Sequence, residues 1–298
     1  MKRRFVTLDV FASRPFAGNP LAVVLDAKGL DDTVMQAIAR EFNLAETVFV
    51  LPAEKASHRA RLRIFTPATE LPFAGHPTVG TAVLLNRIDG GSDCEIVLEE
   101  GIGPVHCATT AMNTERGHAR FQLARLPEEV GRAADVETIA AALGLKVEDI
   151  EFDDFKPSCW SAGISFTFVP VCGLDAIRRC QPNLAYWQAA FEQDGRSSTY
   201  VFCCETIDSG SAFHARMFAP RLGIAEDPAT GAAAAAFSGV LVRFRSPADG
   251  VHDFPIEQGY EMGRPSLIGL SVTVQNRQLA ATAISGEAIV ISEGTIEA

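Results

Sequence analysis

The sequence predicts an α+β protein built from two similar halves, and three observations support this fold class. Strand-like and helix-like segments alternate along the 298 residues. A short strand-like segment that ends in proline occurs at 63–67 and again at 216–220, an offset of 153 residues. About ten residues after each copy, at 77–82 and 228–233, comes a cluster of Pro, Thr, Gly and Ala. Because both features recur in the same order about half a chain apart, we predict a duplicated, two-lobed architecture.

The bulk composition is that of a globular protein and limits the classes of function. Hydrophobic residues make up 47% of the chain and charged residues 21%, and the length suffices for two domains of ordinary size. The formal net charge of −11 argues against a nucleic-acid partner, because a phosphate backbone requires a basic surface. The seven cysteines are irregularly spaced and include no C-x-x-C. We therefore expect free, buried thiols rather than a disulfide framework.

The sequence contains no recognisable targeting or membrane segment. A basic run at 2–4 precedes an apolar segment, but Asp9 and Arg14 interrupt that segment, so a signal peptide is not expected. The longest apolar stretch, 231–242, is far too short to span a bilayer. We therefore expect a cytoplasmic protein without a membrane partner.

The first half alternates predicted strands with one clear helix. Val34, Ile38 and Phe42 are spaced four apart, which predicts an amphipathic helix at 31–42 that ends at Asn43. Runs of β-branched and aromatic residues, separated by turn signals such as Gly-Asn-Pro, predict the strands. The predicted strands of this half are 4–10, 21–25, 46–51 and 61–66.

The second half continues the alternation after a stretch at 122–134 that carries proline, glycine and charge. This stretch is the predicted boundary between a first lobe at 1–125 and a second lobe at 126–298. Helical spacing of apolar residues, with Gly144 as a stop signal, predicts the helices of this half. The predicted helices are 136–143 and 184–191, and the predicted strands are 199–204, 212–218, 270–274 and 287–291.

The small-residue segment D-P-A-T-G-A-A-A-A-A-F, at 227–237, predicts a buried helix. Asp227 suits the N-cap position and Pro228 the first helical position, and the alanines propagate the helix. Because no face carries a bulky side chain at its start, such a helix packs closely against surrounding strands. The free N–H groups in its first turn and the positive end of the helix dipole predict an anion-binding site.

The segment G-H-P-T-V-G-T-A, at 75–82, has the same design. Pro77 is the expected first helical residue and His76 the expected cap. Ser, Thr, Asp and Asn cap helices better than histidine does, so an imidazole at this position points to function. If the two halves are pseudo-symmetric, both helix starts face one cleft, where a carboxylated substrate meets N–H donors from both sides.

Taken singly, each candidate residue has a plain structural explanation. Asp227 alone is most simply an N-cap, His76 a hydrogen-bonded histidine, and Glu46 an exposed residue between a helix and a strand. Only their combination favours a catalytic site. Other sites have little support: the sequence has no Walker loop, no complete dinucleotide fingerprint and no G-x-S-x-G elbow, and its six histidines lack the spacing of metal ligands.

Five longer segments resemble the PhzF-type phenazine-biosynthesis isomerases, and the resemblance covers nearly the whole chain. It implies the fold of diaminopimelate epimerase, with two pseudo-symmetric lobes that each wrap a mixed β-sheet or barrel around a central α-helix. The active site then lies between the lobes, and the extreme C-terminus can return to the first lobe. The segments are D-V-F-A-S-R-P-F-A-G-N-P-L-A-V-V at 9–24, A-R-E-F-N-L-A-E-T-V-F-V at 39–50, R-I-F-T-P-A-T-E-L-P-F-A-G-H-P-T at 63–78, R-M-F-A-P-R-L-G-I-A-E-D-P-A-T-G-A-A at 216–233 and E-Q-G-Y-E-M-G-R-P-S at 257–266.

The resemblance also implies the chemistry. Glu46 matches the family's catalytic acid/base in N-L-x-E-T, His76 the histidine of G-H-x-T, and Asp227 the aspartate of D-P-x-T-G. In the prototype, the glutamate moves a proton between two carbons of a hydroxylated dihydroaromatic amino acid, and no cofactor is needed. The implied partners are a small carboxylated substrate and a second copy of the chain in a homodimer. The expected substrate-binding residues are Gly75, Thr78, Thr230 and Gly231.

Two departures from related families narrow the mechanism. Many relatives have a serine where this chain has Ala232, so one hydroxyl contact is missing. Diaminopimelate epimerases carry reactive cysteines in the two motifs, whereas 73–76 and 227–230 contain none, so two-thiol racemisation lacks its nucleophiles. The expected function is therefore a cofactor-independent isomerase. The alternatives are a metabolite- or partner-binding protein without catalysis and a one-base epimerase.

Overall fold

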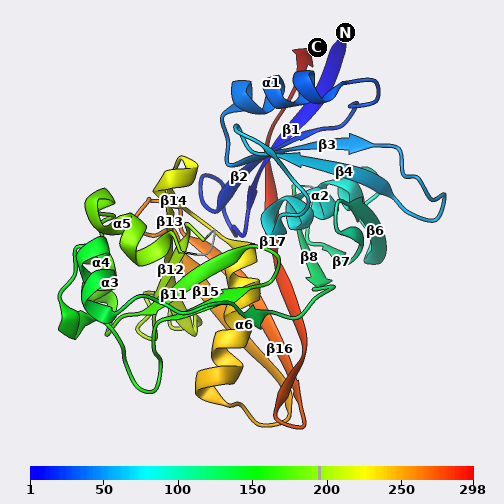
Figure 1. Ribbon diagram of the computed structural model, residues 1–298. Helices are drawn as coiled ribbons and strands as arrows, with labels where there is room; N and C mark the ends of the chain where they lie inside the picture. The colour runs from blue at the N-terminus through cyan, green and yellow to red at the C-terminus, as the bar shows by residue number, and fades with distance from the viewer. Residues whose placement is uncertain (114, 194–195) are drawn as a thin grey trace. The chain divides into compact units, whose positions relative to one another are not determined.

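The structure is a computed structural model in which the chain forms two compact units (Figure 1). One unit comprises Met1–Gln122 together with Ser285–Ala298, and the other comprises Leu123–Ile284. Each unit combines mixed β-structure with one helix that is buried among the strands. The residues that the structure describes are 1–113, 115–193 and 196–298.

The first unit is a closed β-barrel. Its strands are β1 (Lys2–Val10), β2 (Asn19–Val24), β3 (Glu46–Leu51), β4 (Ala60–Phe65), β5 (Glu70–Leu71), β6 (Cys94–Glu100), β7 (Gly103–Ala111), β8 (Arg116–Gln122) and the second part of β17 (Gln278–Glu297). Pairing runs from β1 through β2, β3, β4, β6 and β7 to β8, and β17 pairs with both β8 and β1. Each strand of this ring is therefore paired on both sides, as closure of a barrel requires.

Helix α2 (Gly75–Ile88) is enclosed by this barrel and is buried from Gly75 to Asn86. It contacts β1, β2, β3, β6, β7 and β8 (Figure 1). A Cβ atom at Gly80 would lie 2.7 Å from side-chain atoms of both Val10 and Leu21, closer than carbon atoms can approach. The small residues of α2 therefore allow the helix to pass directly against the strands, as the sequence predicts.

Helix α1 (Asp32–Phe42) is the amphipathic helix that the sequence predicts. Asp31 is its N-cap and accepts a hydrogen bond from Val34 N at 2.9 Å. Asn43 closes the helix in the left-handed conformation. The buried face of α1 packs into a cluster that includes Phe49 and Phe65 of the barrel strands, which fixes the start of β3 relative to the rest of the unit.

The second unit contains the remaining elements. Its strands are β9 (Glu128–Glu129), β10 (Ser158–Ser161), β11 (Ser165–Pro170), β12 (Thr199–Cys203), β13 (Phe213–Ala219), β14 (Ile224–Asp227), β15 (Gly250–Gln258), β16 (Ser266–Gln275) and the first part of β17. Its helices are α3 (Val136–Leu143), α4 (Leu174–Arg179), α5 (Leu184–Phe191) and α6 (Gly231–Arg245), with short 3₁₀ turns η1 (Val147–Asp149) and η2 (Pro220–Leu222). Helices α3, α4 and α5 pack around Trp187 in a core that also includes Val169 of β11, Val201 of β12 and Phe218 of β13.

The strand pairings of the two units repeat each other, which confirms the duplication that the sequence predicts. In the first unit, β1–β2, β3–β4, β4–β5 and β6–β7 are antiparallel, whereas β2–β3 and β4–β6 are parallel. In the second unit, β10–β11, β12–β13, β13–β14 and β15–β16 are antiparallel, whereas β11–β12 and β13–β15 are parallel. Each of these strands therefore has a counterpart with the same direction and the same neighbours.

The repeated segments at 63–67 and 216–220 both begin with Arg-x-Phe, and this shared pattern has a structural cause. The Cζ atom of Arg63 on β4 lies 5.1 Å from the centroid of a phenylalanine ring two residues further along the chain. The Cζ atom of Arg216 on β13 lies 4.8 Å from the ring centroid of the equivalent phenylalanine. Each guanidinium also forms an ion pair with a glutamate, at 2.6 Å for Arg63 and 2.8 Å for Arg216. The rings are those of Phe65 and Phe218, and the glutamates are Glu70 and Glu226.

Helix α6 is buried from Gly231 to Leu241, apart from Ala232, and packs in an aromatic core around Phe237. The prediction that Asp227 caps this helix is wrong. The helix begins at Gly231 with Thr230 as its N-cap, and Asp227 ends strand β14 opposite Met217. Strand pairing overrides the local Asp-Pro capping pattern because it engages the backbone of Asp227 before the helix starts.

The start of α2 also differs from the prediction. The helix begins at Gly75 with Ala74 as its N-cap, so His76 is the second helical residue rather than the cap. Several strands lie outside the predicted ranges altogether, and β17 extends over twenty residues where the sequence predicts only 287–291. The strands that lie outside every predicted range are β5, β6, β7, β8, β9, β10, β11, β14 and β15.

The expectation of buried cysteines holds for Cys107, Cys159, Cys180 and Cys203 and is wrong for three others. Cys94, Cys172 and Cys204 are exposed, and no disulfide bond is formed among the cysteines of the described residues. Among the helices of the described residues, none combines the length and the apolar character that a membrane span requires.

Candidate active site

Glu46 is the first residue of β3, at one end of the barrel. Its backbone pairs with Leu21 of β2 in parallel register. The side chain is 15% exposed, so the carboxylate is largely enclosed rather than solvated. The position follows from the chain upstream, because α1 ends at Asn43 in a left-handed turn that leads directly into β3.

His76 lies in the first turn of α2, and its imidazole is buried. The Nε2 atom lies 3.2 Å from Oε2 of Glu46. Burial lowers the pKa of His76 to about 3, so the ring is neutral at neutral pH. The barrel therefore brings together two of the three predicted catalytic residues, with Nε2 of His76 and Oε2 of Glu46 in close contact.

The first turn of α2 also carries backbone donors. Ala74 cannot cap the helix because its side chain has no acceptor. Gly75, the predicted substrate-binding residue, and His76 each carry an N–H in this turn, whereas Pro77 has none. An uncapped helix start with N–H groups at the positive end of the dipole is suited to a carboxylate.

Thr78 is fully buried in the same turn. Its Oγ1 lies 2.8 Å from the carbonyl oxygen of Ala74 and 2.8 Å from Oε1 of Glu100. The hydroxyl group of Thr78 therefore already contacts two groups of its own unit, and its predicted contact with a substrate stays a prediction.

The third predicted catalytic residue, Asp227, lies at the end of β14 and is 8% exposed. Thr230 donates from Oγ1 to Oδ2 of Asp227 at 2.6 Å, so the turn before α6 closes on itself. Gly231 is the first residue of α6, where Thr230 forms no side-chain cap hydrogen bond. The second helix therefore also begins with an uncapped turn beside a carboxylate.

Gln258 of β15 holds this turn in place, and the sequence analysis gave it no role. Its Nε2 donates to the carbonyl oxygen of Asp227 at 2.7 Å, and its Oε1 accepts from Thr230 N at 3.2 Å. The hydroxyl of Tyr200 donates to the same Oε1 at 3.3 Å, and burial raises the pKa of this phenol. The only signal in the sequence is the position of Gln258 in the segment at 257–266 that carries the family resemblance.

The next residue, Gly259, explains how β15 can come so close to the segment before α6. It has φ of +78°, and a Cβ atom there would lie 2.6 Å from the carbonyl oxygen of Pro228. Glycine is therefore required both by the left-handed backbone and by the close approach. The described residues contain no group of three or more His, Cys, Asp or Glu side chains placed to hold a metal ion.

Comparison with known proteins gives one consistent family. The profile of the family described as "Phenazine biosynthesis-like protein" matches residues 8–294. An uncharacterized isomerase of Mesorhizobium japonicum is 48% identical over 99% of this chain and 98% of its own length. The trans-2,3-dihydro-3-hydroxyanthranilate isomerase of Pseudomonas aeruginosa is 34% identical over 98% of both chains.

Solved structures agree with this grouping. The phenazine biosynthesis protein of the PhzF family from Bacillus anthracis superposes with a TM-score of 0.89 at 28% identity, and all of both chains is covered. A probable proline racemase from Agrobacterium radiobacter superposes with a TM-score of 0.64 at 12% identity, over 99% of this chain and 93% of its own. The second likeness concerns the fold alone.

Proposed function

Because this chain belongs to the PhzF family of phenazine biosynthesis-like proteins, we propose that it is a cofactor-independent isomerase with Glu46 as its acid/base. The reaction moves a proton between two carbons of a small carboxylated substrate. The observation that carries this proposal is the enclosed Glu46–His76 pair, with Oε2 and Nε2 3.2 Å apart. The isomerase names of the relatives support the reaction class.

In the proposed reaction, Glu46 removes a proton from a carbon next to an unsaturated group of the substrate. The electron pair left on that carbon shifts into the unsaturated system, and Glu46 then returns the proton to a second carbon. No proton is gained or lost overall, and the substrate itself accepts the electrons. His76 orients the carboxylate through its Nε2 and, as a neutral ring, leaves it free to act as a base.

The remaining predicted residues are proposed to bind substrate. The N–H groups at Gly75 and at Gly231 receive negative charge, and Asp227 with Thr230 binds amino or hydroxyl groups. We also propose that the two compact units correspond to the lobes expected at 1–125 and 126–298, with the C-terminal segment Ser285–Ala298 returned to the first unit. Thr78 belongs to the substrate-binding set by resemblance.

The substrate class is proposed from the relatives. Three relatives from Pseudomonas species, 33–34% identical to this chain, are named trans-2,3-dihydro-3-hydroxyanthranilate isomerases. A hydroxylated, unsaturated ring that carries an amine and a carboxylate would use the donors and acceptors described above. A one-base epimerase is the second candidate, since a single enclosed carboxylate can return a proton to either face of the same carbon.

The test is proton NMR in D₂O with trans-2,3-dihydro-3-hydroxyanthranilate, using the wild-type protein and Glu46→Gln. We expect loss of a carbon-bound proton signal together with product formation in the wild type. The variant should be slower by at least about a thousandfold, because it has lost the acid/base group. The matched control is Glu41→Gln, which makes the same chemical change at an exposed position of α1 and should keep the wild-type rate.

Each outcome of this experiment separates two candidates. Equal turnover by Glu46→Gln contradicts the role of Glu46. Exchange at one carbon with inversion of configuration, and no double-bond shift, identifies an epimerase. Binding of the substrate without any exchange in the wild type contradicts isomerisation of this compound and favours a protein that binds without catalysis.

A further inference from the structure

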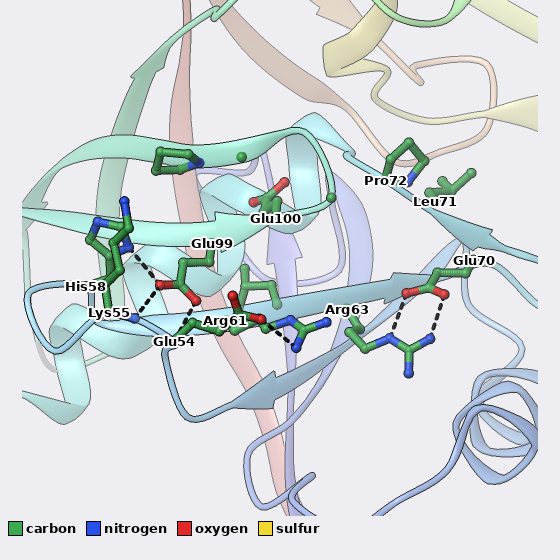
Figure 2. A pocket seen from close by; sticks show the side chains of 14 residues that line it. Glu54, Lys55, His58, Arg61, Arg63, Glu70, Leu71, Pro72, Glu99 and Glu100 are labelled. Atoms are coloured by element: carbon green, nitrogen blue, oxygen red, sulfur yellow. Dashed lines mark hydrogen bonds and ion pairs between the residues drawn. The ribbon is translucent and has the colours of Figure 1, made fainter.

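Two adjacent glutamates at the end of β6 have opposite surroundings. Glu99 lines a surface hollow of about 540 Å³, where it accepts hydrogen bonds from the backbone of Glu54 and Lys55 and contacts His58 (Figure 2). Glu100 borders the same hollow but is only 8% exposed. In Figure 2, dashed lines join Glu99 to its partners, whereas the carboxyl group of Glu100 lies away from this cluster. Because successive side chains of a β-strand point to opposite faces, the carboxyl group of Glu99 lies at the hollow and that of Glu100 is buried.

Glu100 meets the first turn of α2 inside the barrel. Its Oε1 lies 2.8 Å from Oγ1 of Thr78, and its Oε2 is buried without a hydrogen-bond partner among the described residues. Thr78 is two residues after His76 and three after Gly75, in the turn that carries the proposed catalytic and substrate-binding groups. Glu100 is therefore coupled to that turn through one hydroxyl.

Whether the contact between Thr78 and Glu100 is a hydrogen bond depends on the protonation state of Glu100. The hydroxyl of Thr78 has one proton, but its oxygen lies 2.8 Å from two oxygens, that of Glu100 and the carbonyl of Ala74. A carbonyl oxygen only accepts. If Thr78 donates to Ala74, the contact with Glu100 is a hydrogen bond only when Glu100 carries a proton. Protonated Glu100 therefore satisfies both contacts, whereas an ionised one satisfies a single contact.

The electrical surroundings agree with a neutral carboxyl group. Burial raises the pKa of Glu100 to about 8, against a smaller opposing effect of the hydrogen bond from Thr78. Cys107 of β7 is also neutral, since burial and the nearby Glu100 raise its pKa to about 12. His76 on α2 is uncharged because burial lowers its pKa. An ionised Glu100 would offset the positive end of the helix dipole and so compete with any anion that binds there.

We propose that Glu100 is a positioning residue that works only in its protonated form. It holds Thr78 and the first turn of α2 in place, and it leaves that turn free of negative charge, so that the N–H groups can bind the carboxylate of the substrate. The functional part of this inference rests on the proposed isomerase activity. Ionisation of Glu100 weakens binding of an anionic substrate and leaves the proton transfer by Glu46 unchanged.

The kinetic test compares the pH dependence of KM and kcat in the wild type, Glu100→Gln and Glu99→Gln. In the wild type, we expect KM to rise about tenfold between pH 7 and pH 9 with little change in kcat. Glu100→Gln, which keeps a hydrogen-bond donor and cannot ionise, should keep the KM of pH 7 across this range. The neighbouring control Glu99→Gln should behave as the wild type. An alkaline rise in KM that survives in Glu100→Gln overturns the proposal, as does its loss in Glu99→Gln.

Two further readouts do not require turnover. Infrared difference spectra of wild type minus Glu100→Gln at pH 6 should show the band of a protonated carboxylic acid, and its absence overturns the proposal. Calorimetric binding of anthranilate, an unreactive amino carboxylate, should weaken between pH 7 and pH 9 in the wild type and in Glu99→Gln but not in Glu100→Gln. If anthranilate binds with this pH dependence but no compound turns over, the isomerase proposal fails and the role of Glu100 stands. If turnover occurs but the affinity for anthranilate is independent of Glu100, the isomerase proposal stands and the role proposed for Glu100 fails.

Discussion

The two buried helices, α2 and α6, occupy equivalent places in units of the same topology, but the side chains at their first turns differ in kind. Around α2, the groups are titratable: His76 faces Glu46, and Glu100 contacts Thr78. Around α6, the amide of Gln258, the hydroxyl of Thr230 and the carboxylate of Asp227 form a hydrogen-bonded network that holds the turn. The same architecture thus supports one helix start suited to moving protons and another suited to holding polar groups in place.

The largest expected effect tests this difference directly. Glu46→Gln should lower kcat by at least about a thousandfold, because the acid/base group is lost. Asp227→Asn should mainly raise KM, because Asp227 is held by Thr230 in a network that binds rather than transfers. Steady-state kinetics of both variants provides the measurement. A fall in kcat for Asp227→Asn as large as that for Glu46→Gln would remove the distinction between the two helix starts.

The next largest effect concerns how the free energy of unfolding depends on pH. His76 and Glu100, two buried groups of the first unit, change it in opposite directions. The pKa of His76 falls from 6.5 to about 3 on folding. The neutral ring therefore contributes fully to the free energy of unfolding above pH 6.5, and this contribution is lost as pH falls toward 3. The pKa of Glu100 rises from 4.5 to about 8 on folding. The protonated carboxyl group therefore contributes fully to the free energy of unfolding below pH 4.5, and this contribution is lost as pH rises toward 8. Each slope is at most ~1.4 kcal/mol per pH unit.

Urea unfolding at pH 4, 5.5, 7 and 8 checks these slopes. Glu100→Gln should remove the loss of stability that the wild type shows above pH 6.5, and His76→Asn should remove the loss that it shows below pH 4.5. Because the two slopes oppose each other between pH 4.5 and 6.5, the wild type should be nearly level there. A wild-type stability that rises steadily from pH 5.5 to 8 would mean that Glu100 is ionised in the folded state.

A smaller effect is expected from the network at α6. Gln258→Leu leaves the carbonyl of Asp227 and the N–H of Thr230 without their buried partner, which should lower the free energy of unfolding by about 1–3 kcal/mol. The exposed Gln275→Leu is the matched control and should change stability by less than about 0.5 kcal/mol. Equal effects of the two variants would show that the turn does not depend on Gln258.

The smallest expected effect compares the recurring arginines. Arg216 is buried and donates to the carbonyl oxygens of Ile177 and Cys180 besides its glutamate. Arg63 lies nearer the surface, and its acidic partners are more exposed. Arg216→Lys should therefore lower the free energy of unfolding by about 1–2 kcal/mol and Arg63→Lys by less than about 1 kcal/mol. Chemical denaturation of both variants measures the difference, and the reverse order would contradict the argument from burial.

Much of the fold was predictable because the repeat is visible in local sequence. The Arg-x-Phe pattern and the small-residue helices reveal the duplication without long-range information. Strands β6 to β8 were missed although their signal exists: in β7, buried Val105 and Cys107 alternate with exposed His106. The start of α6 was misplaced because strand pairing and the contact with Gln258 determine where that helix begins.

The candidate site was predictable only in part. Glu46 was found through the family resemblance and His76 already through its place at a predicted helix start. The two are far apart in the sequence, and only the fold brings their reactive atoms within 3.2 Å. Glu100 has no distinguishing signal in the sequence, since its neighbour Glu99 is the same residue type with the opposite surroundings. What distinguishes the two is the face of the strand on which each side chain lies, and this depends on register.

Strand β17 has a consequence for how the chain acquires its structure. Glu297 pairs with Lys2, so the first barrel is completed by a segment that is synthesised after the whole second unit. Until then, β1 lacks its partner on one side and exposes backbone donors and acceptors that can pair with other chains. Such distant pairing predicts slow folding of the first barrel and a need for the intact C-terminal segment during synthesis.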